Sequence, residues 1–175
     1  MTALPAGGRA GSRQAREPTG RQARPMRFHL VDRIDSWESN RRIVGRKVTS
    51  GTEQFWRAGL TGPVMPPPLV LEALCQAGTW LVMMSSGHRK RAALLSVGEV
   101  SFLGDVTPGD VLLLDGTVVS ISDEVAVLDG TVSVGERTVL TATSIMCALI
   151  DAERLDDPVA TARMADQLTG AVSAP

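Results

Sequence analysis

The sequence predicts an α+β domain in which an antiparallel sheet wraps around one long central helix. Strand-like runs fall into two groups, with two runs before a single apolar helical stretch and four runs after it. The four later runs follow one another through short turns, which is typical of an antiparallel meander. The helical stretch is apolar on nearly all of its faces, and such a helix is buried. A sheet that curls around this helix is the simplest way to bury both.

The 175 residues are enough for one domain with tails. Residues 1–25 are rich in Arg, Gly, Ala and Pro and have few large apolar side chains, so we expect a disordered tail. The domain itself is expected over residues 26–152. Residues 153–175 are polar again, and a weak amphipathic helix is expected within them over Val159–Leu168.

Composition excludes several function classes. The net charge of −1 gives no electrostatic reason to expect a nucleic-acid partner. Cys75 and Cys147 stand in apolar runs without a neighbouring Cys or His, so they predict buried free thiols in a cytoplasmic protein and no metal site. Signal-peptide and transmembrane patterns are absent, as are glycine-rich phosphate loops, HExxH, GxSxG and CxxC motifs. We therefore expect no cofactor and no membrane partner.

Phe28–Ile34 is expected to be a first strand or the lead-in to it, and Arg41–Thr49 a second strand, with a turn over Asp35–Asn40 between them. The second run alternates apolar and polar residues, as a half-buried strand does. His29 lies in the first run. A lone histidine in such a run is more often a packed or edge residue than a catalyst, and we expect that of His29.

The central helix is expected to begin at Pro67 or Pro68 and to continue to Met84. Proline is tolerated in the first turn of a helix because its missing N–H has no intrahelical partner there. Glu72 is the single acid in this apolar stretch. It either faces solvent near the helix N-terminus, or it acts as a general acid or base. Gln76 lies one turn further along the same face and could hold the carboxylate.

The residues after the helix predict a basic loop and then the meander. Ser85–Arg91 is either a solvated connection or a landing patch for an acidic partner, such as an acyl carrier protein with its phosphopantetheine arm. One helix covers a six-stranded sheet poorly, so we expect a dimer. The four strands are expected over Ala92–Phe102, Val111–Ile121, Glu124–Val134 and Thr138–Ile150.

These features together resemble the hotdog-fold 3-hydroxyacyl-[acyl-carrier-protein] dehydratases. The resemblance covers about Arg27–Ala152, and its most specific part is the helix segment Leu71–Gln76. The other matching segments are Leu30–Arg33, Pro63–Pro66, Val100–Phe102, Val106–Asp110 and the apolar run through Cys147 and Ala148. The resemblance implies a hotdog fold, an acyl-carrier-protein or acyl-CoA thioester as substrate, and a homodimer or heterodimer.

The resemblance also implies roles for individual residues. Glu72 takes the position of the catalytic acid, and Gln76, Met65 and Pro66 are the expected substrate contacts. In this family the acid of one protomer works with a histidine of the other, which lies in the loop before the helix. The pair removes an α-proton and protonates the departing hydroxyl. A glycine N–H at the helix N-terminus polarises the thioester carbonyl.

The sequence departs from the family pattern at two positions. An ungapped comparison sets Ala58 at the histidine position and Pro67 at the glycine position. Alanine cannot transfer a proton, and proline has no N–H to donate. Loss of either group typically lowers a rate by ~10²–10⁴.

Three functions follow as hypotheses, in this order. The chain is a degenerate subunit whose Glu72 completes the active site of an intact hotdog partner. Alternatively, it is an acyl thioesterase that uses Glu72 with Gln76 or Thr79. Finally, it is a non-catalytic module that binds an acyl chain or a carrier protein.

Overall fold

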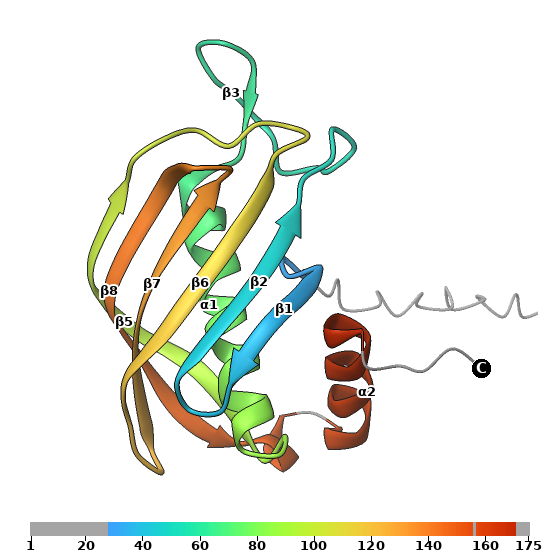
Figure 1. Cartoon of the computed structure of the whole chain (residues 1–175), viewed down its shortest axis with the longest axis vertical. Coiled ribbons are helices and arrows are strands. Elements are labelled where there is room, and N and C mark those ends of the chain that lie inside the picture. Colours follow the sequence, from blue (N-terminus) through green and yellow to red (C-terminus); the bar gives the residue numbers. More distant parts are fainter. Residues whose placement is uncertain (1–27, 156, 171–175) are drawn as a thin grey trace, which may run out of the picture.

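The computed structural model describes residues 28–155 and 157–170. A six-stranded antiparallel sheet curls around the helix α1 (Pro67–Ser85), and a second helix, α2 (Pro158–Thr169), lies beside one edge of the sheet (Figure 1). The α+β class and the hotdog arrangement, a sheet wrapped around one long helix, are therefore confirmed. The expected tail over residues 1–25 lies outside the described residues.

The strands of the main sheet are all antiparallel and follow the spatial order β1-β2-β6-β7-β8-β5. Four of the five strand pairs in this sheet contain a register shift, namely β1–β2, β5–β8, β6–β7 and β7–β8. Such bulges bend a strand and increase its twist, which lets the sheet curl over α1. The strands are β1 (Arg33–Glu38), β2 (Arg42–Val48), β5 (Lys90–Phe102), β6 (Val111–Ile121), β7 (Val125–Val134) and β8 (Arg137–Asp151).

The central helix begins and ends close to where its sequence predicts. Pro66 is the N-cap and Pro67 is the first helical residue. The buried side chains of α1 face the concave side of the sheet and include Val70, Leu74 and Leu81. By length and composition alone α1 is also a candidate membrane span, although we expected it to be too short. Burial against the sheet accounts for the same apolar residues.

The first strand and the hairpin before α1 differ from the sequence-based expectation. Of the two alternatives for Phe28–Ile34, the structure shows mainly the lead-in, because β1 runs over Arg33–Glu38. Leu30 is buried as a strand pattern suggests, yet its N–H donates to a side chain and not to a neighbouring strand. A short hairpin, β3 (Arg57–Ala58) with β4 (Pro63–Val64), was not foreseen. It projects beyond the N-terminal end of α1 (Figure 1).

The two edges of the sheet have different neighbours. α2 packs against β1 at one edge and also contacts α1. This helix is the one expected over Val159–Leu168, and it is capped at both ends. Asp157 Oδ1 accepts the Val159 N–H at 2.9 Å, and Gly170 ends the helix in the left-handed conformation. At the other edge β5 pairs only with β8.

Candidate functional site

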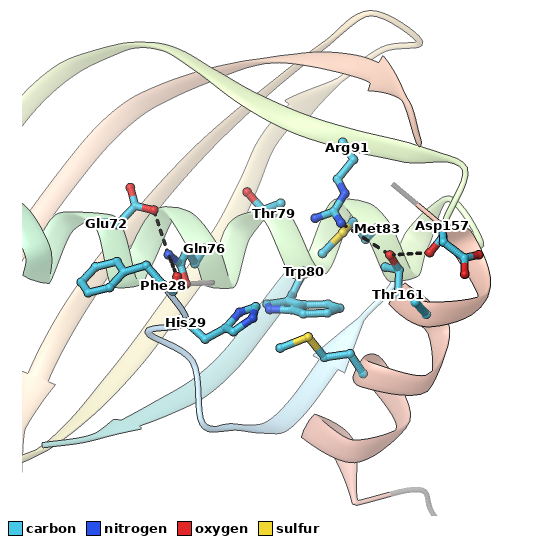
Figure 2. Close-up of a pocket in the computed structure, with 12 residues that line it drawn as sticks. Phe28, His29, Glu72, Gln76, Thr79, Trp80, Met83, Arg91, Asp157 and Thr161 are labelled. Carbon is cyan, nitrogen blue, oxygen red and sulfur yellow. Dashed lines mark hydrogen bonds between the residues drawn. The ribbon is translucent and has the colours of Figure 1, made fainter. Parts of the chain in front are cut away.

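An open cavity of about 400 Å³ runs along the face of α1 that the sheet leaves uncovered. Its volume falls within the range of ~300–1,000 Å³ that is usual for small-molecule sites. Glu72 lies at one end of this cavity, and the N-terminus of α2 lies at the other (Figure 2). The lining residues are Phe28, His29, Glu72, Gln76, Thr79, Trp80, Met83, Arg91, Asp157, Ala160, Thr161 and Met164.

A hydrogen-bond network built on Gln76 holds the acid. Gln76 Nε2 donates to Glu72 Oε1 at 2.9 Å and to the Phe28 carbonyl at 3.0 Å, while Gln76 Oε1 accepts the Leu30 N–H at 2.8 Å. One amide therefore uses both of its donor hydrogens and its oxygen. The network fixes the segment that carries Phe28 against α1 and orients the Glu72 carboxylate, as the one-turn spacing of the two side chains predicts.

The N-terminus of α1 has unusually few amide donors. Pro66, Pro67 and Pro68 have no N–H, and the Leu69 N–H donates to the Pro66 carbonyl at 2.8 Å. The first N–H groups of a helix are ordinarily the ones that bind a ligand oxygen. At this helix start, the three prolines remove those groups and Leu69 uses its own within the chain.

The β3–β4 hairpin carries the position that the ungapped comparison assigns to histidine. Ala58 is exposed on β3 and pairs with Pro63. The Gly59 N–H closes the hairpin by donating to the Gly62 carbonyl at 2.8 Å. A Cβ added at Gly59 would come within 2.7 Å of a Val64 methyl, so this tight turn requires glycine. The hairpin is thus a defined element that presents a small apolar side chain where a proton-transfer group is expected.

The far end of the cavity is polar and joins β5 to α2. Arg91 Nη2 lies 3.5 Å from Thr161 Oγ1, and Thr161 Oγ1 also donates to the Asp157 carbonyl at 3.2 Å. Between this end and Glu72 the wall is mixed: the indole of Trp80 and the side chain of Met83 lie there with the polar side chains of Thr79 and His29 (Figure 2). Met164 of α2 adds a further apolar side chain to the lining.

The cysteine next to Glu72 is no nucleophile at neutral pH. Burial raises the pKa of the Cys75 thiol to about 12, with a further contribution from the negative charge of Glu72. A thiol with so high a pKa carries almost no thiolate, which is the reactive form. Both Cys75 and Cys147 are free. Among the described residues there is also no group of three or more His, Cys, Asp or Glu side chains that could hold a metal ion.

The structure brings together some of the expected site residues and separates others. Glu72 and Gln76 both line the cavity. Met65 does not, because its side chain is only 2% exposed and packs in the core. Pro66 caps the helix and is likewise outside the cavity wall. His29, which we expected to be a packed or edge residue, lines the cavity beside Trp80 (Figure 2).

Sequence reasoning missed most of the remaining wall. Arg91 was assigned to a solvated basic loop, yet it is the second residue of β5 and reaches the cavity. Trp80 and Met83 belong to the helix that we expected to be buried, and both are largely buried while each also lines the cavity. Thr161 was not singled out. Its position in a weakly amphipathic stretch gives no sign that it meets a residue seventy positions earlier.

The family model and the curated relatives that this chain resembles agree on one family. A family model described as a FabA-like domain matches residues 23–143. The chain is 38% identical over 112 residues to a 3-hydroxyacyl-[acyl-carrier-protein] dehydratase FabZ of Moorella thermoacetica, a match that covers 63% of this chain and 78% of the relative. It is 32% identical over 114 residues to the FabZ of Caulobacter vibrioides, covering 63% and 72% of the two chains.

Solved structures support the fold. A protein of Streptococcus mutans UA159, solved bound to acetyl-CoA, aligns with a TM-score of 0.54 at 19% identity and covers 72% of this chain and 95% of its own. The Escherichia coli PaaI protein of the phenylacetic acid degradation operon aligns with a TM-score of 0.51 at 14% identity and covers 66% and 75%. At these identities the likeness concerns the fold alone.

Proposed function

The chain belongs to the FabA-like domain family, and from that premise we propose that it acts on 3-hydroxyacyl thioesters in fatty-acid or polyketide-type biosynthesis, as the acid-bearing subunit of a dehydratase. In this proposal Glu72 is a general acid or base in a site that a second hotdog subunit completes. Dehydration breaks the α-C–H bond, forms the carbon–carbon double bond, and releases the 3-hydroxyl as water after it gains a proton. Glu72 and a histidine of the partner carry these two proton transfers.

The observation that carries this proposal is the contrast between an intact acid and a helix start without donors. Glu72 is held by Gln76 in an open cavity. The helix start offers three prolines and a Leu69 N–H that is already bonded to Pro66. A thioester carbonyl bound there would develop negative charge without an amide to stabilise it. The missing donor has to come from another chain, which also explains why the acid is retained.

The exposed β5 edge supports a second subunit. β5 has thirteen residues and, among the described strands, pairs only with β8, so none of these strands lies beside one row of its backbone N–H and C=O groups. Leu95 is 58% exposed and Phe102 is 45% exposed on this strand. A long apolar edge strand of this kind is a template for pairing with another strand. The opposite edge is occupied by α2, which leaves β5 as the edge available to a partner.

His29 is a second possible source of a proton-transfer group. The sequence contains two histidines, His29 and His88, and His29 lines the cavity. Figure 2 shows the Gln76 amide between the His29 imidazole and Glu72. The Leu30 N–H beside His29 already donates to Gln76 Oε1, so this backbone donor is not available to a thioester carbonyl. We therefore favour a histidine from the partner.

The test is reconstitution with the hotdog protein that co-purifies from the native source. Glu72→Gln should lower dehydration of a 3-hydroxyacyl carrier thioester by ~10²–10⁴ while assembly is unchanged. His29→Asn, the control within the same cavity, should change the rate far less. A stable homodimer without a hotdog partner, together with full dehydration by Glu72→Gln, would refute the proposal.

Two other outcomes would assign a different function. Hydrolysis of acyl-CoA that disappears in Glu72→Ala would indicate the thioesterase, with Gln76 and Thr79 as the neighbouring polar groups in the cavity. Binding of acyl thioesters without turnover, unaffected by changes at Glu72, would indicate a binding module. We expect neither, because the helix start lacks the donor that a thioesterase also needs and because Gln76 orients a carboxylate that mere binding would not require.

A further inference from the structure

The far wall of the cavity comes from a part of the chain that the family match does not include. The match ends at residue 143, and α2 begins at Pro158. Asp157 and three residues of α2, namely Ala160, Thr161 and Met164, provide four of the twelve lining residues. Part of the end of the cavity that lies far from Glu72 is therefore built by residues beyond the matched segment, while Arg91 and Met83 lie within that segment.

The distance between the two ends suits an acyl chain that lies along α1. Glu72 and Met83 are eleven positions apart on the helix, which is about 16 Å at ~1.5 Å per residue. Glu72 marks the thioester end under the proposed function, on which this inference rests. A chain that starts there passes Trp80 and reaches Arg91 beside Met83 (Figure 2). The apolar side chains of Trp80, Met83 and Met164 in this wall can contact methylene groups, whereas Arg91 at the far end offers hydrogen-bond donors.

The chemistry of the far end favours oxygen over hydrocarbon. A guanidinium has five N–H donors in a planar fork, so Arg91 can bond protein and ligand oxygens at the same time. A hydrocarbon end would contact these donors without accepting from them, which is costly for a polar group removed from water. The Asp157 carboxylate lines the same end and would repel a ligand carboxylate. A neutral hydroxyl or carbonyl can accept from Arg91 without that repulsion.

We propose that α2 and Arg91 form the end wall of the acyl site and select acyl thioesters that carry a neutral hydroxyl or carbonyl oxygen on the chain, remote from the thioester. Trp80, Met83 and Met164 surround the methylene groups in between. The fixed position of the wall also limits chain length, because a longer chain meets α2 instead of solvent. Sites built to bond a substrate oxygen reject analogues without it far more strongly than apolar pockets reject an extra methylene.

The experiment measures binding without turnover. The probes are pantetheine analogues in which a methylene replaces the thioester sulfur, with plain, ω-hydroxy and ω-carboxy acyl chains of matched length, titrated calorimetrically over a series of lengths. The wild-type protein should bind the best ω-hydroxy chain about tenfold or more tightly than the plain chain, which corresponds to one hydrogen bond to a charged group. The ω-carboxy chain should bind less well than the ω-hydroxy chain.

Arg91→Met retains much of the length of the side chain and removes its donors, so it should abolish the preference for oxygen. Arg89→Met is the matched control, because Arg89 is exposed and outside this cavity. Melting temperatures confirm that both variants fold. Equal binding of the three chains by the wild type, or an unchanged preference in Arg91→Met, would overturn the inference. Glu72→Gln should keep the preference while it loses turnover, so failure of the proposed reaction is distinguishable from failure of this site.

Discussion

The two ends of the α1 cavity differ in origin and in the way they are held. The Glu72 end lies within the segment matched by the family model, and its acid is held by a side-chain amide on the same helix. The Arg91 end depends on α2, which lies outside that segment and joins β5 through the Arg91–Thr161 contact. The Glu72 end thus lies wholly within the matched segment, whereas the far end combines Arg91 from that segment with a helix that lies beyond it.

The two ends of the cavity also differ in how firmly the rest of the domain holds them. Glu72 is on the central helix, whose other faces are buried in the core, so its position is tied to the stability of the whole domain. α2 is held by the buried Thr161, Ala165 and Leu168 and by its two caps. A short peripheral helix with few buried side chains is easier to release than a core helix. Substitutions can therefore disturb the far end while the acid end stays in place.

The largest effect is expected from Leu168→Ala, which removes a buried anchor of α2. Leu168 is 7% exposed, and truncation of a buried leucine typically costs about 2–5 kcal/mol. Because the lost packing lies under α2, the melting temperature should fall and discrimination between plain and ω-hydroxy chains should weaken. Thermal unfolding and the calorimetric titrations measure both. Val159→Ala, on an α2 residue that is 57% exposed, is the control and should change little. Undiminished chain discrimination in Leu168→Ala would contradict a role for α2.

A smaller effect on stability, but a sharper effect on the acid end, is expected from Gln76→Leu. The variant leaves the Phe28 carbonyl and the Leu30 N–H without their side-chain partner, which should cost about 1–3 kcal/mol in the free energy of unfolding. Glu72 loses its orienting donor, so turnover in the reconstituted dehydratase should fall more than acyl binding does. Denaturant unfolding and steady-state kinetics measure the two changes.

Gln167→Leu gives the matched control for that variant, because Gln167 is exposed on α2 and lines no part of the cavity. It should leave both stability and turnover close to the wild type. If Gln76→Leu changed stability but left the ratio of turnover to binding unaltered, the glutamine would serve only to fix the N-terminal segment.

Local features of the sequence predicted the acid end, because its residues interact within one helix. The prolines set the start of α1, and the spacing of Glu72 and Gln76 placed them on one face. The far end could not be predicted in this way. Arg91 and Thr161 are separated by 70 positions and meet only because β5 begins where α2 packs. No local periodicity encodes that contact.

The start of β1 at Arg33, after an apolar lead-in, has a physical reason as well. Leu30 and Val31 are buried, so their apolar character resembles that of a strand. The backbone of this segment nevertheless bonds to the Gln76 side chain, and regular pairing begins only at Arg33. The same network explains why His29 lies in the cavity wall, since Gln76 holds the residue before it and the residue after it. The hydrogen-bond partner of the Leu30 N–H is a side chain forty-six positions away, and such a contact leaves no periodic pattern in the sequence.

The smallest expected effect concerns Cys75, which reports the charge at the acid end. Its thiol pKa is raised to about 12, first by burial and then by the negative charge of Glu72. Alkylation requires the thiolate, so at pH 8 to 10 the reaction in the folded protein should be slow and should accelerate about tenfold per pH unit. Removal of the Glu72 charge lowers the pKa of the thiol. Glu72→Gln should therefore react faster than the wild type at every pH in this range, and Arg91→Met should react at the wild-type rate.

Peptide-resolved mass spectrometry separates Cys75 from Cys147, whose pKa is also raised by burial. Equal rates for wild type and Glu72→Gln would mean that the Glu72 side chain does not influence the Cys75 thiol. Faster alkylation in Arg91→Met would mean that the two ends of the cavity are not independent.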